Sequence, residues 1–457
     1  MSNAIATKNL EVIVIGAGTG GLCLAHGLKR AGITVNVFER DRTRKDGLQG
    51  YRVGIDPDGS RALHANLPKE LFDTFIATCA ISPKFFNIFT EHLSEVLSVD
   101  ATPADPDSPF GEHSVSRMTL RQVLLTGLES IVHFDKVFSR YEHLPDGRVM
   151  AHFEDGTSAV GDVLVAADGS NSRVRRQYLP QAQMEDTLIR SIGGKVPATR
   201  ESLALVTPKI RRGVSLIQAP GGLGGILHVM EFPWDKDGVK HGIGSTDADL
   251  IAQWPGLMFD NTRDYISWGI WASADKFPSG FRDMTGPELL ALTQRMTASW
   301  HPDWKKLLTL SDPGSVFPVV IRTSVPLAAW TPSNVTLLGD AIHTMTPGRG
   351  VGANTALRDA VALTRHLVAV RDGRRQLSEA IGAYEQKMRT YGYEAVLKSR
   401  QQMDGRAAIH KPFIGRLQLG LMRAVMRTIN ATPPLKRKMT ENLNAFRDHA
   451  HDDTELV

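Results

Sequence analysis

Three segments of the chain share one pattern of apolar and polar positions, in which a short apolar run leads through a glycine-containing turn into apolar residues at helical spacing. They lie at about residues 11–39, 163–176 and 335–369. A short and almost wholly apolar run is typical of a strand buried on both faces of a parallel sheet. Helical spacing directly after such a run indicates a strand–loop–helix unit. The pattern therefore predicts an α/β fold.

Residues 184–330 have a different pattern, with longer stretches in which apolar and polar residues alternate, and they hold all seven tryptophans. Alternation predicts strands with two distinct faces. Because the strand–loop–helix segments lie on both sides of this region, we expect two lobes that are interleaved along the chain. The expected divisions are residues 1–83, 101–183 and 331–400 for the first lobe, residues 84–100 and 184–330 for the second lobe, and residues 401–457 for C-terminal helices and a polar tail.

Composition excludes several classes of protein. The chain has 457 residues, of which 42% are hydrophobic and 22% charged, as in an ordinary globular protein. A formal net charge of +4 is too dilute over this length to indicate a nucleic-acid partner. Two cysteines cannot build a disulfide framework or a four-thiolate metal site, so we expect no metal. No stretch resembles a signal peptide or a membrane span, and the default expectation is a soluble, cytoplasmic protein.

The first glycine-containing turn, Gly16-Ala-Gly18-Thr-Gly-Gly21, fits the G-x-G-x-x-G pattern between a strand and a helix. In that setting Gly16 permits a tight turn, Gly18 lets the backbone approach a pyrophosphate, and Gly21 lets the helix pack close to the strand. The second strand ends in Glu39, whose carboxylate would accept hydrogen bonds from a ribose diol. A carboxylate at this position, followed by Arg40, argues against NADP, because the carboxylate would repel the 2′-phosphate of that cofactor. The segment predicts a dinucleotide site without separating NAD from FAD.

The second and third turns place an acidic residue just after a strand. Asp168 with Gly169 is, taken alone, a routine turn and helix cap. In the third turn, Gly339-Asp340 puts a carboxylate where it can reach a polyol chain. The glycine-rich stretch 347–354 then begins another helix, whose positive N-terminal end suits a ligand that gains negative charge.

These three motifs, in this order, resemble those of the class A flavoprotein monooxygenases, the para-hydroxybenzoate hydroxylase-like and salicylate hydroxylase-like FAD-dependent enzymes. The resemblance implies a Rossmann-like (GR2-type) FAD-binding lobe, interleaved with a mixed β-sheet substrate lobe and followed by C-terminal helices. It also implies that Glu39 binds the adenosine ribose, that Asp340 binds the ribityl chain, and that Asp168 lies near the pyrophosphate. The expected cofactor-binding set is completed by Gly16, Gly18, Gly21, Arg40, Arg52, Gly54, Arg117, Pro347, Gly350, Gly352, Ala353 and Asn354.

Two of these matches are looser. The segment that begins at Arg52 is similar to the family's arginine and glycine segment beside the mobile flavin. Arg117, with Arg121 four residues later, is similar to the family's arginine pair at a helix start, where Thr119 and Gln122 fit a capping box. We expect Arg52 and Arg117 to contact the cofactor and leave Arg121 unassigned.

The function implied is that of an oxidoreductase of secondary metabolism, an FAD-dependent monooxygenase driven by NADH or NADPH. A flavin C4a-hydroperoxide in a dry pocket would insert one oxygen atom of O2 into a hydrophobic aromatic or natural-product-like molecule, by hydroxylation or epoxidation. Alternatives are a flavin reductase or oxidase of the same fold, Baeyer–Villiger-type oxygenation, an NAD dehydrogenase, and a flavin-binding regulatory protein. The oligomeric state is open.

The sequence does not assign a general base. Arg52, Arg190 and His228 are the candidates for catalytic side chains. The gathering of tryptophans in one lobe favours a bulky apolar or aromatic substrate.

The segment 414–429 carries Leu417, Leu421 and Val425 at four-residue spacing, with arginines between them. Such spacing predicts an amphipathic helix. We expect it to pack on the FAD-binding lobe, with peripheral contact to a membrane surface as the alternative.

Overall fold

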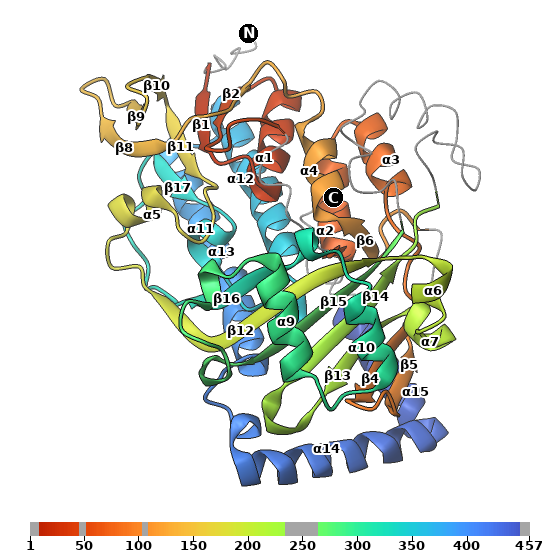
Figure 1. Ribbon diagram of the computed structural model, residues 1–457. Helices are drawn as coiled ribbons and strands as arrows, with labels where there is room; N and C mark the ends of the chain where they lie inside the picture. The colour runs from red at the N-terminus through yellow and green to blue at the C-terminus, as the bar shows by residue number, and fades with distance from the viewer. Residues whose placement is uncertain (1–8, 45–51, 103–107, 234–263, 448–457) are drawn as a thin grey trace.

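The computed structural model describes residues 9–44, 52–102, 108–233 and 264–447, with side chains up to residue 441 in the last range. Trp234 and Trp254 therefore lie outside the described residues. Within these ranges the chain forms two lobes, each built on a sheet and covered by helices (Figure 1). No helix among them is both long enough and apolar enough to span a bilayer.

A five-stranded parallel sheet forms the centre of the first lobe, in the order β17-β11-β1-β2-β7. Its strands are β1 (Glu11–Ile15), β2 (Thr34–Phe38), β7 (Val132–His133), β11 (Val163–Ala166) and β17 (Val335–Leu337). Helices α1 (Thr19–Arg30), α12 (Gly352–Arg371) and α13 (Leu377–Gln402) share one apolar core with these strands. Because all five strands run in the same direction, their carboxyl ends meet at one edge.

Smaller elements complete the first lobe. An antiparallel sheet has the order β10-β9-β8, and β3 pairs with β6 in a separate ribbon. The strands are β3 (Arg52–Ile55), β6 (His113–Ser116), β8 (Phe138–His143), β9 (Val149–Phe153) and β10 (Ser158–Gly161). The helices are α2 (Pro57–Asn66), α3 (Lys69–Ala77), α4 (Arg117–Leu125), α5 (Arg173–Tyr178) and α11 (Asp340–His343).

The second lobe contains a seven-stranded sheet in the order β16-β12-β15-β14-β13-β4-β5, which is mixed because β13 pairs with β4 in parallel. Its strands are β4 (Phe85–Thr90), β5 (Glu95–Asp100), β12 (Met184–Pro197), β13 (Gly213–Gln218), β14 (Gly224–Met230), β15 (Tyr265–Ser273) and β16 (Phe317–Ser324). Its helices are α6 (Arg200–Leu203), α7 (Pro208–Arg211), α9 (Gly286–Met296) and α10 (Pro302–Thr309). The α/β fold class expected from the sequence is confirmed.

The two faces of the seven-stranded sheet have different surroundings. On one face, which we call the helix-covered face, Ile192, Leu227 and Trp268 pack with Trp300 and Trp304 into a core beneath α9 and α10 (Figure 1). The gathering of these tryptophans in one lobe is thus explained by packing and does not by itself indicate a substrate. Strand partners share a face, and the register therefore places a half-buried set on the opposite, open face. These residues are Ser191, Leu216, Ile226, Ser267, Trp271, Phe317 and Val319.

The two C-terminal helices, α14 (Pro412–Ala431) and α15 (Pro433–Arg447), lie at the β5 end of this sheet. Met426 and Ile429 of α14 pack against the cluster around Val96 and Leu97. The expectation that α14 packs on the FAD-binding lobe is wrong. Four-residue spacing identifies an apolar stripe, but it does not say which side of the helix meets the protein.

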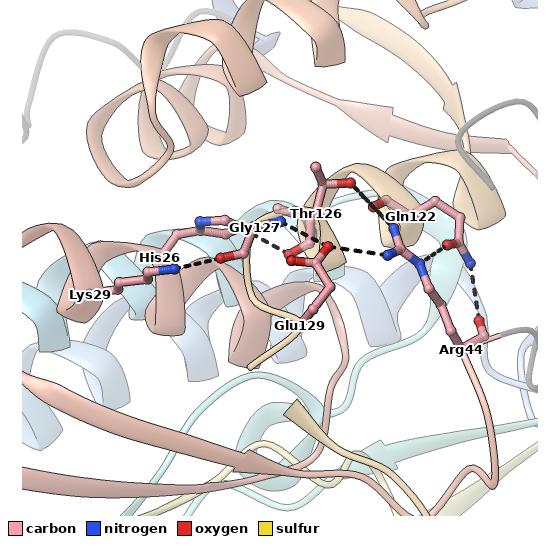
Figure 2. A network of polar contacts seen from close by, with 8 residues as sticks. His26, Lys29, Arg44, Gln122, Thr126, Gly127 and Glu129 are labelled. Carbon is pink, nitrogen blue, oxygen red and sulfur yellow. Dashed lines mark hydrogen bonds and ion pairs between the residues drawn. The ribbon is translucent and has the colours of Figure 1, made fainter. Parts of the chain in front are cut away.

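A polar network joins α1, α4 and the chain that follows β2 (Figure 2). The Arg44 guanidinium donates from Nε to Gln122 Oε1 at 2.5 Å and from Nη2 to the Gln122 carbonyl at 3.0 Å, and Gln122 Nε2 donates back to the Arg44 carbonyl at 3.1 Å. Lys29 Nζ donates to the Gly127 carbonyl at 2.6 Å. The network holds α4 in place beside the strand ends.

The expected capping box of Thr119 and Gln122 is absent. Helix α4 begins at Arg117 with Ser116 as its N-cap. Thr119 therefore lies inside the first turn, where its hydroxyl is buried without a partner among the described residues. The Gln122 amide is engaged by Arg44 instead.

Candidate functional site

Four of the five parallel strands lead directly into a residue singled out by the sequence. Gly16 follows β1, Glu39 follows β2, Asp168 follows β11 and Asp340 follows β17. The Gly16 amide donates to the Phe38 carbonyl at 2.8 Å, which joins the ends of β1 and β2. We call this group the strand-end edge. The edge of an open parallel sheet at the carboxyl ends of its strands is the usual ligand site of such folds.

The glycines of the first turn meet different demands. Gly16 has φ of +107°, and a Cβ there would lie 2.4 Å from the Ala167 carbonyl oxygen. A Cβ at Gly21 would lie 2.3 Å from the Gly16 carbonyl oxygen, so helix and strand pack too closely for a side chain. At Gly18 the nearest atom would be 4.0 Å away. The chain itself therefore does not require glycine at position 18, whereas a ligand lying against the turn would.

The N-terminal ends of α1 and α12 both face outward without a cap. Neither helix has a side-chain cap or an acidic residue in its first turn. By contrast, Asp56 caps α2 by accepting from the Gly59 amide at 2.9 Å. Uncapped amides at a helix start, together with the helix dipole, favour an anionic group. One such helix end can bind a phosphate group. The other can favour negative charge on a second part of the same ligand.

Glu39 and Arg121 lie at the β2 side of this edge. The Ala17 amide donates to Glu39 Oε2 at 2.6 Å, so the buried carboxylate is held beside the glycine turn. Arg121 Nη2 lies 2.8 Å from Asp41 Oδ2 and 3.9 Å from Glu39 Oε2. The sequence left Arg121 unassigned, although its position four residues after Arg117 was the available signal. Arg40 is exposed.

Asp168 has one carboxylate oxygen without a hydrogen-bond partner among the described residues. Its Oδ2 accepts from the Arg173 amide at 2.8 Å. Its Oδ1 is buried and has no partner in the described parts of the chain. Burial raises the pKa of this carboxyl, with hydrogen bonds from Ser172 and nearby amides opposing the shift. An unpaired buried acceptor beside the glycine turn fits a ligand that donates to it.

Asp340 lies at the edge after β17, as the first residue of α11. Water reaches its side chain, yet the surrounding protein removes enough solvent to raise the pKa of the carboxyl. The positive charges of His343, Arg117 and Arg175 oppose that rise. Arg117 is itself exposed, so a carboxylate and a guanidinium within interaction range of each other both lie at the surface.

Behind Asp340 lies a buried network that the sequence analysis missed. Asp359 of α12 accepts at Oδ2 from the Gly339 amide at 2.7 Å and pairs through the same oxygen with His343 Nε2 at 2.6 Å. Its Oδ1 accepts from the Tyr391 hydroxyl at 2.5 Å. Burial would lower the pKa of His343, but Asp359 outweighs burial and the pKa lies above its ordinary value. The available signal was an aspartate within the apolar stripe of a helix.

The turn before α12 is tied to β3 by Asn354. Its Nδ2 donates to the Gly54 carbonyl at 3.1 Å, and its Oδ1 accepts from the Asp56 amide at 3.2 Å. The rest of the turn is less covered than Asn354, because Pro347 and Gly350 are exposed, and Gly352 and Ala353 are half-buried. The turn therefore presents its backbone to the space in front of the strand-end edge.

The structure separates the three catalytic candidates. Arg190 is bound by both Asp186 carboxylate oxygens, at 2.8 and 2.7 Å, and shares the helix-covered face with Ile192. His228 lies on the open face, where its strand partner is Ser267. Arg52 of β3 is close enough for its charge to act on His228. His228 thus lies within range of the Arg52 charge, and Arg190 does not act on it. The Arg52 guanidinium itself donates from Nε to Ser114 Oγ at 2.9 Å and lies 3.5 Å from Glu112 Oε1.

His228 is neutral and has a free acceptor. Burial, followed by the charge of Arg52, lowers its pKa to about 3. Its Nδ1 lies 3.3 Å from the Gly213 carbonyl, which can only accept, so the ring proton belongs on Nδ1. Nε2 is then an acceptor, and it has no partner within the described ranges.

Comparisons with known proteins identify the class to which this fold and site belong. The family model of an FAD binding domain matches residues 293–399. A solved structure of an FAD-containing monooxygenase from Photorhabdus luminescens is 32% identical, with a TM-score of 0.72, and the match covers 86% of this chain and 98% of that one. The chain belongs to the class A flavoprotein monooxygenases. FAD is thus the cofactor of this family, as the motifs implied.

Two further proteins show how much of this chain, and of each relative, the similarity covers. A dual O-methyltransferase/FAD-dependent monooxygenase from Phaeosphaeria nodorum is 31% identical over 369 residues, which cover 78% of this chain and 40% of that protein. The chain spans less than half the length of the first curated relatives it matches. Klebsiella pneumoniae HpxO, solved with FAD and uric acid, shares the fold at 23% identity with a TM-score of 0.72, the match covering 98% of this chain and 99% of that one.

Proposed function

We propose that the chain catalyses an NADH- or NADPH-driven insertion of one oxygen atom of O2 into a hydrophobic aromatic or natural-product-like small molecule. The observation that carries the proposal is the unpartnered acceptor of His228, which lies within range of the Arg52 charge. They lie where the open face of the substrate sheet approaches β3, which Asn354 ties to the flavin-side turn. A polar pair at the border of an apolar face suits a substrate that is largely apolar and carries one polar group.

The strand-end edge would hold FAD. The uncapped start of α1 would bind the pyrophosphate, Glu39 would accept from the adenosine ribose, and Asp340 would accept from the ribityl hydroxyls. The start of α12 would favour negative charge on the flavin ring. When bound and reduced, the cofactor supplies the activation of O2, and the protein supplies position and polarity.

On the substrate side, His228 would act as a neutral acceptor. A substrate hydroxyl can donate to Nε2, and the nearby Arg52 charge stabilises the partial negative charge that this hydrogen bond draws onto the oxygen. This polarisation of the O–H bond makes a phenol ring more electron-rich. Half-buried Ile226 and Trp271 on the same face would contact the apolar part of the substrate and exclude water.

The test uses purified, FAD-loaded protein with NADH or NADPH, isotopically labelled O2 and a panel of hydroxylated aromatic and terpenoid compounds. We expect an active compound to stimulate nicotinamide oxidation and to carry one labelled oxygen in the product. Changing His228 to leucine should lower kcat/KM for a phenolic substrate by about tenfold, the usual scale for losing one hydrogen bond to the substrate, while flavin content stays unchanged. Nicotinamide oxidation without label in any organic product would favour a reductase or oxidase, and a labelled ester or lactone would favour Baeyer–Villiger oxygenation.

A further inference from the structure

The outer side of α14 carries a row of large apolar side chains that remain exposed to solvent. The exposed fractions are 87% for Phe413, 57% for Ile414, 77% for Leu417, 67% for Leu421 and 51% for Val425. The helix runs along the outer margin of the molecule, at the far end from β1 and α1 (Figure 1). A surface helix normally turns such a stripe towards the core, and a continuous exposed row marks a site of interaction.

The opposite side of α14 already fixes the helix to the protein. Leu419 is buried, and Arg423 is paired with Glu91. Asn430 Nδ2 donates to Glu95 Oε1 at 3.1 Å. Because these contacts occupy the inward side, the apolar row cannot also face the sheet.

Charge distinguishes between the partners that such a row could meet. Between residues 405 and 440 the sequence has eight lysines and arginines and no aspartate or glutamate. Arg416 and Arg427 are exposed on α14, and Lys411 is exposed at its start. A second copy meeting this face through a two-fold axis would bring these like charges together, which opposes association. An anionic partner would be attracted.

An apolar groove runs beside the row. It has a volume of about 400 Å³ and lies between α14, α15 and β5. Leu97, Leu421, Met422, Met426 and Ile429 contribute to a lining that is almost wholly apolar. Methionine-rich surfaces adapt to flexible apolar ligands, and a hydrocarbon chain is the simplest such ligand.

We propose that α14 is an in-plane membrane-binding helix for a bilayer that contains anionic lipids. The row from Phe413 to Val425 enters the boundary between headgroups and acyl chains, and Lys411, Arg416 and Arg427 contact the headgroups. An exposed apolar face with basic residues at its flank is the physical requirement for this mode of binding. The groove accepts part of an acyl chain.

Docking by α14 would bring the substrate side of the protein to the lipid. Phe86, Met426 and Ile429 pack against the same cluster around Val96 and Leu97. Phe86 pairs with Val214, and Val214 pairs with His228, so all three lie on the open face. The helix thus borders the face that the proposed function assigns to an apolar substrate.

The experiment is flotation of the 457-residue, FAD-loaded protein with vesicles of phosphatidylcholine alone or mixed with phosphatidylglycerol. We expect binding to the mixed vesicles that weakens as salt is added. The double change Leu417→Glu with Leu421→Glu should abolish binding. Reversing Arg416 and Arg427 to glutamate should weaken binding to mixed vesicles by at least about tenfold, since each basic residue near an anionic surface contributes roughly a fivefold factor.

A matched control separates this site from general surface hydrophobicity. Leu397 of α13 is 49% exposed, and Leu397→Glu should leave binding unchanged. All these side chains are exposed, so flavin content and Tm should stay close to those of the parent protein. The proposal is overturned if the parent protein floats with neither vesicle. It is equally overturned if the protein is a dimer that Leu417→Glu with Leu421→Glu converts to a monomer, because the row then serves a second copy.

Discussion

The strand-end edge and the open face place their chemistry in different ways. At the strand-end edge, each functional residue follows its own parallel strand, so a stretch of a few consecutive residues carries both the strand and the group that it positions. On the open face, single residues from many strands contribute, and every second residue belongs to the opposite side. Parallel strands therefore collect ligand-binding groups at their ends, whereas a mixed sheet collects them across a surface that depends on register.

The strand-end edge and the helix-covered face also differ in the use of their polar groups. Groups at the edge are open to a ligand, whereas those of the face stabilise the fold. Residues at the strand-end edge leave donors and acceptors unpaired, as Asp168 Oδ1 does. The helix-covered face of the other sheet is closed, with Trp268 Nε1 donating to the Ser311 hydroxyl at 2.9 Å. Substitutions can test how far this division holds.

The largest effect is expected at the first glycine. Gly16→Ala places a Cβ against the Ala167 backbone at a φ of +107°, and we expect it to cost about 4 kcal/mol or more or to prevent FAD binding. Gly32→Ala is the matched control, because its φ is +70° with nothing within 4 Å of the new Cβ. It should cost only about 1 kcal/mol. Urea unfolding and flavin content measure both. Equal losses at the two positions would contradict the close packing at Gly16.

The second-largest loss of stability is expected on the helix-covered face of the seven-stranded sheet, in comparison with its open face. Trp268 is 2% exposed and packs edge-on against Trp304, so Trp268→Ala should lower the free energy of unfolding by about 3–5 kcal/mol. Trp271, three residues later, is half-buried on the open face, and Trp271→Ala should cost less than about 2 kcal/mol. Chemical denaturation of the two variants is the measurement. A larger loss at Trp271 would show that the open face is itself part of the core.

Substitution of Asp359, the buried carboxylate behind Asp340, should lower the free energy of unfolding by an intermediate amount that depends on pH. Asp359→Asn weakens the pair with His343 and should cost about 3 kcal/mol near pH 6. Because Asp359 raises the pKa of His343, the pair's stabilisation is fully present below the unfolded pKa of histidine and is lost as pH rises through the higher folded pKa. The loss should thus be smaller at pH 9. Thermal unfolding at both pH values tests this, and a loss independent of pH would contradict a charged pair.

The smallest change in stability is expected at Asp56, whose amide donates to Asn354 Oδ1. Burial raises the pKa of its carboxyl to about 7, so its contribution to stability is present at low pH and is lost as pH rises from about 4 to 7. Asparagine keeps the helix cap. Asp56→Asn should match the parent protein at pH 4 and exceed it by about 1–2 kcal/mol at pH 8, which is less than the full shift implies because the group is partly hydrated.

Asp155 is the control of opposite sign for this measurement. The Lys136 and Thr157 side chains hold the pKa of its exposed carboxyl at about 2. Asp155→Asn should therefore lose stability at pH 8 relative to the parent protein, and the difference should vanish as pH falls through 2. If both variants changed stability in the same direction at pH 8, the burial of Asp56 would not be the cause.

The sequence by itself determined the cofactor class and the positions of Gly16, Glu39, Asp168 and Asp340 relative to their strands. Each of these depends on contacts a few residues apart, which local pattern and backbone geometry encode. Tertiary structure alone decided that His228 lies within range of the Arg52 charge while Arg190 is held by Asp186, that Asp359 supports Gly339, and that Leu417 of α14 faces outward. Those outcomes depend on which surfaces pack together over hundreds of residues, and neither residue spacing nor composition carries that information.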